Sequence, residues 1–121
     1  MSDKTQYLAH ALLNHTLRNT AYTSPTTVYL GLHTSVAEVS NGSYARQAIT
    51  FGAPSNGEVK NSADVEFPVA TGDWGEIVNG KIYDAEEHGN ALYEADLTVS
   101  KTIDTNDQFV VRENDCTVKE E

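Results

Sequence analysis

The hydrophobic period of the sequence changes at Pro25, and this change limits the folds that the chain can adopt. Before Pro25, apolar residues recur with the spacing of one face of an α-helix. Beyond it, short runs alternate apolar with polar residues, as half-buried β-strands do, and Gly, Asn, Asp and Ser separate the runs. No helical pattern stands between these runs. The sequence therefore predicts one N-terminal helix and an antiparallel β fold.

The predicted helix spans residues 2–19. Its apolar side chains form two adjacent rows, Leu8 with Leu12 and Ala9 with Leu13 and Leu17. Asn19 can end the helix, and Pro25 prevents it from resuming. A stripe this narrow covers one face of another element. That element is either the sheet of the same domain or a neighbouring subunit, and the pattern leaves both open.

Seven or eight short strands are expected within residues 26–119. The candidate strands are 26–34, 44–51, 63–69, 76–84, 91–97, 99–103, 108–112 and 116–119. Strands of this length and spacing are typical of an antiparallel β-sandwich or jelly roll. The chain of 121 residues can bury one core, so we expect a single domain over residues 1–121.

Three segments are expected to be loops. Residues 35–43 and 52–62 are the longest turn-rich stretches, and the acidic residues 85–90 are predicted to join two strands of a hairpin. Loops extend from the ends of a sandwich, where they can contact partners.

The charge composition excludes several classes of partner. Eighteen Asp and Glu against eight Lys and Arg give a formal net charge of -10, and the basic residues are scattered singly. Binding to nucleic acid or to an anionic membrane requires clustered basic residues, so neither partner is expected. The first thirty residues show no signal-peptide pattern, which predicts folding in a reducing cytoplasm. Cys116 is the single cysteine, and we expect it to be a small buried apolar residue.

The sequence offers no convincing catalytic or metal-binding motif. His10 and His15 are five residues apart, which turns their side chains away from each other on a helix, and His33 and His88 have no evident catalytic companion. The chain has no Gly-x-Ser-x-Gly motif, and most carboxylates fall in loops or on outward strand positions. We therefore expect no enzyme activity, no cofactor and no metal.

Three residues are candidates for contact with a protein partner. In residues 44–51 the alternation places Tyr44 and Arg46 on the outward face. It places Ala45, Ile49 and Phe51 on the inward face. Trp74 follows a strand and lies near Gly72 and Gly75. Tyr, Trp and Arg commonly anchor protein interfaces, so Tyr44, Arg46 and Trp74 are the predicted contacts. The alternative is that Trp74 fills the open end of the sandwich.

Several segments carry a resemblance to a known family. They are Val28-Tyr29-Leu30-Gly31-Leu32, Gly42-Ser43-Tyr44-Ala45-Arg46-Gln47, Asp73-Trp74-Gly75, Ile82-Tyr83-Asp84-Ala85 and Gly89-Asn90-Ala91-Leu92-Tyr93. Together they resemble a family of small tailed-bacteriophage virion structural proteins, some described as tail-fibre-like and some similar to capsid decoration proteins. The resemblance implies a β-sandwich that assembles into a virion in the host cytoplasm.

Three functions are compatible with the sequence. The favoured hypothesis is a capsid decoration (cement) protein that binds the outer surface of the major capsid lattice, because one compact acidic domain suits dense display. The alternative is a tail fibre or baseplate component involved in host attachment. A carbohydrate-binding module, or a small carbohydrate-active enzyme, is the third. The expected partners are the major capsid protein or another virion protein, and further copies of the chain in a dimer or trimer.

Overall fold

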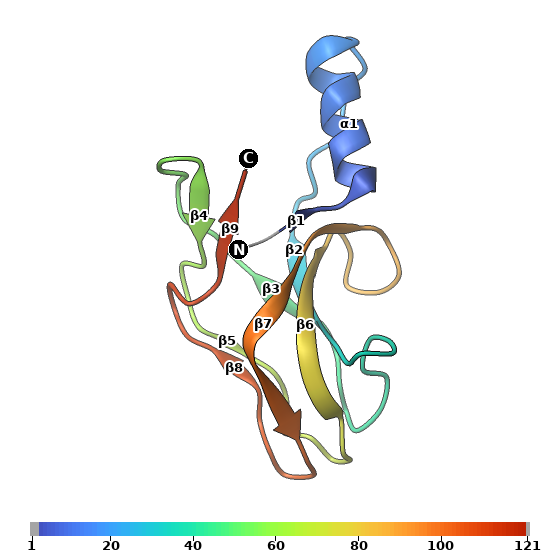
Figure 1. Cartoon of the computed structure of the whole chain (residues 1–121), viewed down its shortest axis with the longest axis vertical. Helices are drawn as coiled ribbons and strands as arrows, with labels where there is room; N and C mark the ends of the chain where they lie inside the picture. Colours follow the sequence, from blue (N-terminus) through green and yellow to red (C-terminus); the bar gives the residue numbers. More distant parts are fainter. Residues whose placement is uncertain (1–2, 121) are drawn as a thin grey trace.

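The computed structural model describes residues 3–120, which form one helix and nine strands (Figure 1). The helix is α1 (Gln6–Leu17). The strands are β1 (Asp3–Lys4), β2 (Val28–His33), β3 (Gln47–Ile49), β4 (Glu58–Lys60), β5 (Val65–Glu66), β6 (Gly75–Tyr83), β7 (Ala91–Ile103), β8 (Val110–Val111) and β9 (Thr117–Lys119). The predicted mostly-β fold with an N-terminal helix is confirmed.

The strands form two layers, and every pairing is antiparallel. One layer is a five-stranded sheet of order β1-β7-β6-β2-β3. The other consists of two short ladders, β4-β9 and β5-β8. Because β5 follows β4 and β9 follows β8 in the chain, the second ladder continues the first. Figure 1 shows the two ladders beside the larger sheet. The arrangement is a small β-sandwich.

The core lies between the two layers. Its side chains include Leu30, Leu32, Ile49, Val65, Ile77, Ile82 and Ile103. Phe67 is completely buried at the centre. Its ring makes an edge contact with Phe109 at 5.7 Å between centroids and a stacked contact with Tyr44 at 6.1 Å. Such aromatic pairs add packing energy to the burial of apolar area. Leu30 and Leu32, in the strand predicted at 26–34, and Val65, in the strand predicted at 63–69, are all buried.

Two differences from the predicted strands stand out. Residues 91–97 and 99–103 form one strand, β7, rather than two. Between the pairs Asn79–Asp96 and Ile77–Lys101, four residues of β7 oppose one of β6, and this bulge breaks the alternation that suggested two strands. β4 lies within the predicted loop 52–62, because its register with β9 is a long-range contact with no local signal.

The helix begins at Gln6, later than predicted. Asp3 and Lys4 instead form β1 and pair with β7, while Ser2 lies outside the described residues. Thr5 is the N-cap: its Oγ1 accepts a hydrogen bond from the Leu8 amide (3.3 Å) and donates one to the Ala91 carbonyl (2.7 Å). The start of α1 is therefore fixed to the sheet.

α1 projects from the sandwich (Figure 1). Leu8 is its one buried residue and Leu12 is half-buried. In the second row Leu13 is 53% exposed and Leu17 is 76% exposed. The return segment, residues 18–27, runs back from the end of α1 to β2. The described residues therefore cover the Leu8 row and, in part, Ala9, and they leave Leu13 and Leu17 exposed.

Asn19 ends the helix as predicted, since its φ of 55° is left-handed. The return segment is hydrogen-bonded to α1. The Tyr22 amide donates to His15 Nδ1 (3.2 Å), and the Thr20 amide donates to the Asn14 carbonyl (3.0 Å). The return segment thus binds the end of α1 and leaves Leu13 and Leu17 exposed. We call α1 with its return segment, residues 6–27, the arm.

Candidate interaction site

Arg46 lies at the centre of a polar cluster that joins two loops. Its side chain is only 8% exposed. Its Nε and Nη2 donate to the Glu38 carboxylate at 2.9 and 3.0 Å, and its Nη1 donates to the carbonyls of Ala85 (3.0 Å) and His88 (2.8 Å). Its guanidinium carbon lies 3.4 Å from the centre of the Tyr83 ring. Four of the five N–H donors of Arg46 are thus used inside the chain. We call Arg46 and the groups that it binds, the Glu38 carboxylate and the carbonyls of Ala85 and His88, the clasp.

Tyr44 faces the core, although the alternation placed it outward. Its hydroxyl donates to Glu38 Oε2 (2.7 Å) and accepts from the Leu32 amide (2.9 Å). Its ring meets Trp74 edge-on at 5.4 Å between centroids. The alternation fails here because β3 begins only at Gln47, so residues 44–46 are not in a strand. Ala45, which was expected to be inward, is exposed.

Trp74 fills the end of the sandwich. It is 4% exposed, and its Nε1 donates to the Gly42 carbonyl at 2.9 Å. A side chain at Gly42 would approach this nitrogen to 2.8 Å, so the small residue allows the indole to fit. Stacking on a sugar requires an exposed aromatic face, which Trp74 does not offer. The structure therefore brings Tyr44, Arg46 and Trp74 into one cluster that faces inward.

The pKa shifts in this cluster do not favour proton transfer at neutral pH. Burial alone would raise the pKa of Glu38, but hydrogen bonds from Arg46 and Tyr44 outweigh it and lower the pKa overall. Burial lowers the pKa of His33, and burial together with the Glu38 contact raises the pKa of Tyr44. General acid–base catalysis needs a pKa near the working pH, and these shifts move away from it.

The clasp positions the acidic loop 84–90. The Asn90 amide donates to Asp84 Oδ1 (2.8 Å), and His88 and Gly89 adopt left-handed φ values of 58° and 68°. The predicted hairpin loop at residues 85–90 is confirmed. Glu86 and Glu87 are exposed at its tip, beside a hollow of about 410 Å³ that Arg46 also lines. The loop presents negative charge to solvent in a fixed conformation.

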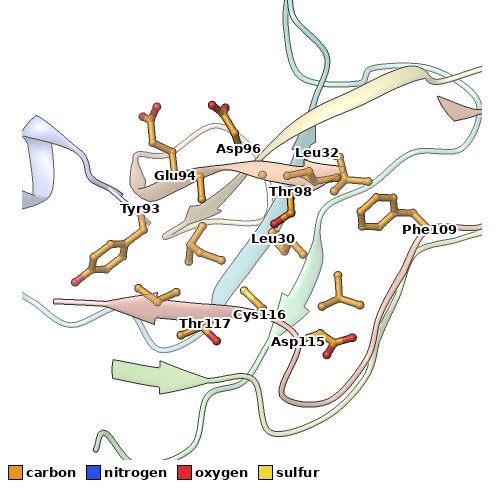
Figure 2. A pocket seen from close by; sticks show the side chains of 16 residues that line it. Leu30, Leu32, Tyr93, Glu94, Asp96, Thr98, Phe109, Asp115, Cys116 and Thr117 are labelled. Atoms are coloured by element: carbon orange, nitrogen blue, oxygen red, sulfur yellow. The ribbon is translucent and has the colours of Figure 1, made fainter. Parts of the chain in front are cut away.

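A second cavity, of about 360 Å³, opens between β7 and the smaller layer, and we call it the open slot (Figure 2). Leu30 and Leu32 of β2 lie at its bottom, and Phe109 and Cys116 line the wall of the smaller layer. Burial raises the pKa of the Cys116 thiol. The slot exists because β1 pairs with β7 only at Tyr93 and Glu94. Along the rest of β7, no described strand pairs with the edge opposite β6.

Acidic residues border the open slot. Glu94 and Asp96 lie on β7, and Asp115 lies on the opposite side. Figure 2 shows the carboxylates of Glu94 and Asp96 directed away from the cavity, so they border it without entering it. No Lys or Arg lines the slot, and none of the ion pairs found within residues 3–120 involves these three carboxylates.

Sequence patterns did not reveal the open slot, because residues of five strands, β2, β6, β7, β8 and β9, build it. A different signal was present for the arm. No Asp or Glu occurs between Lys4 and Ala37, although the whole chain carries eighteen. The segregation of charge sets the arm apart from the sandwich, and it was visible in the sequence.

Within residues 3–120, no group of three or more His, Cys, Asp and Glu side chains is arranged to hold a metal ion. In the same residues, no helix has the length and apolar character needed to cross a membrane.

Comparison with known proteins adds the decisive observation. The family model described as podophage GP4 fiber I protein gp80 matches residues 3–119. The chain belongs to this family. It is thus a phage virion structural protein, as the resemblance implied. The family description favours the tail fibre alternative over the capsid decoration hypothesis. A search of curated proteins found no match.

Proposed function

We propose that this protein is a non-enzymatic component of the phage tail fibre and that it acts by binding other virion proteins. The observation that carries the proposal is the family match, which spans nearly the whole chain and names a podophage fibre protein. A match of this extent concerns the fold as a whole and not a single motif.

The distribution of polar and apolar groups supports a binding role. The largely buried polar cluster around Arg46 uses its hydrogen-bond donors to hold loops together. In contrast, Leu13, Leu17 and Val36 expose apolar area. Leu13 and Leu17 are neighbours on α1, and contiguous exposed apolar area of this kind is typical of contacts between proteins.

We propose that Tyr44, Arg46 and Trp74 contribute to partner contact by holding loops in place. Arg46 and Tyr44 bind Glu38, which lies in the loop whose tip carries Val36, 91% exposed. Arg46 also binds the acidic loop 84–90. Both loops can then meet a partner without rearranging, which lowers the entropy cost of association.

Localisation on the virion tests the proposal. Antibodies raised against the purified protein should label the tail of phage particles in immunogold electron microscopy. Uniform labelling of the capsid would overturn the tail fibre proposal and favour capsid decoration. A second measurement adds purified protein to bare capsids and follows their resistance to heat. A decoration protein would raise this resistance, whereas we expect no change.

A further inference from the structure

The C-terminal half of the second row of α1 is an apolar surface that residues 3–120 leave exposed. Ala9, Leu13 and Leu17 follow one another at intervals of four residues and therefore lie along one side of the helix. Leu17 is 76% exposed and Leu13 is 53% exposed. The hydrogen bonds from the return segment reach Asn14 and His15 and leave both leucines exposed.

The open slot is a concave surface that can receive the exposed leucines of α1. Its bottom is apolar, its walls combine apolar side chains with Thr98 and Thr117, and its volume of about 360 Å³ accommodates the ends of two leucine side chains. The unpaired edge of β7 and the smaller layer form its two sides (Figure 2). Helices commonly bind in such grooves through apolar residues spaced three or four apart.

The charges of the two surfaces are opposite in sign. α1 contains no acidic residue, and Arg18 follows Leu17 directly at its end. The slot is bordered by Glu94, Asp96 and Asp115 with no basic residue in its lining. In a chain with a formal net charge of -10, two copies repel one another except where the acid-free arm of one meets the sandwich of the other.

We infer that α1 of one copy docks in the open slot of a second copy, with Leu13 and Leu17 entering the slot and Arg18 facing its acidic border. Each copy carries one helix and one slot, so the contact joins two different surfaces. It either closes into a ring or a reciprocal dimer, or it continues along a filament. The inference does not depend on where the protein lies in the virion, and purified protein suffices to test it.

Cys116 makes a direct test possible because it lines the slot and is the chain's single cysteine. The variant Leu17→Cys should form a disulfide with Cys116 of a second copy under mild oxidation. Dimers or larger species should then appear on a non-reducing gel. Val36→Cys is the matched control, since Val36 is also a highly exposed apolar residue but lies outside the arm.

The cross-linking pattern distinguishes a second copy's helix in the slot from helix–helix packing and from the chain's own helix. Cross-linking that exceeds the control and disappears when Cys116→Ala is added supports the inference. Cross-linking that persists with Cys116→Ala would show helix packing against helix and would overturn it. So would a disulfide within one copy, which migrates as a monomer and would place a chain's own helix in its slot. A yield no higher than that of Val36→Cys would also overturn it.

A second measurement avoids cysteine chemistry. The double variant Leu13→Asp with Leu17→Asp should raise the dissociation constant for self-association roughly tenfold or more in sedimentation velocity, because charge replaces two apolar contacts. Val36→Asp should leave it unchanged. Circular dichroism establishes that each variant remains folded. Equal self-association of the double variant and the wild type would contradict the inference.

Discussion

The arm and the sandwich differ in how far their apolar side chains are buried. In the sandwich, residues 28–120, apolar side chains from both layers bury one another around Phe67. In the arm, Leu8 is the only apolar side chain that is buried, and Leu17 remains mostly exposed. An apolar row of this kind has no stabilising function in the isolated chain. The difference teaches that the sandwich is built to fold and the arm is built to bind.

Charge separates the two regions as well. The arm contains no acidic residue, whereas carboxylates are distributed throughout the sandwich. Exposed carboxylates keep copies of the sandwich apart and soluble. An arm without them can approach another copy's surface. If this contrast holds, substitutions in the core of the sandwich should affect folding most and substitutions at the border of the open slot least.

The largest effect is expected in the core of the sandwich. Phe67→Ala should lower the free energy of unfolding by about 3–5 kcal/mol, because it removes a fully buried ring from an aromatic cluster. Urea unfolding followed by circular dichroism measures the loss. The wild type should unfold in a single transition if residues 1–121 form one domain, as the sequence predicts. Leu17→Ala is the control and should change stability by about 0.5 kcal/mol or less. Equal losses would remove the distinction between the two regions.

The clasp should contribute less than the core. Arg46→Ala should cost about 2 kcal/mol, because it leaves the partly buried Glu38 carboxylate without its partner. Arg112→Ala is a matched control, since the Arg112–Asp64 pair is exposed and such pairs contribute about 1 kcal/mol or less. The same urea experiment compares them. Similar losses in both variants would mean that the clasp is no stronger than a surface ion pair.

Acidification should weaken the clasp. The folded-state pKa of Glu38 is lowered by Arg46 and Tyr44 despite the opposing effect of burial. Its contribution to stability is therefore complete above its unfolded pKa and is lost as the pH falls through the folded value. Between about pH 5 and pH 3, wild-type stability should fall more steeply than that of Glu38→Gln. Glu66→Gln, a change at an exposed carboxylate, should keep the wild-type slope. Parallel curves for all three proteins would count against the clasp.

The smallest effect on folding is expected at the border of the open slot. Asp115→Lys should change the free energy of unfolding by about 0.5 kcal/mol or less, because Asp115 is exposed. It should nevertheless weaken self-association several-fold at low salt, and this difference should shrink as salt screens the charge. Sedimentation velocity measures both. Glu66→Lys makes the same change of charge away from the slot. An equal effect of Glu66→Lys on self-association would mean that only the net charge of the chain matters and not the position of Asp115.

The sequence predicts those parts of the molecule in which neighbouring residues decide the structure. The alternation in residues 26–34 identifies β2 and its buried leucines, and Asn19 marks the end of the helix. The orientation of Tyr44 could not be predicted, because it depends on Glu38 and Trp74, which reach it through the fold. The open slot lacks a sequence signal for the same reason.

The two rows of α1 show the limit of pattern analysis most clearly. The spacing of Leu8, Leu13 and Leu17 identifies the apolar stripe but does not show what covers each part of it. The structure covers the Leu8 row with the chain itself and leaves Leu13 and Leu17 exposed. The charge distribution, with no acid from residue 4 to residue 37, distinguishes the arm where hydrophobicity alone does not.

Amide hydrogen exchange at increasing protein concentration tests the central claim most directly, since it requires no substitution. If the arm binds a second copy, protection of residues 13–17 and of residues 95–98 and 115–118 should rise together with concentration. Protection of the buried strands β2 and β6 should stay constant. Protection in α1 and the slot that is the same at every concentration would contradict the account.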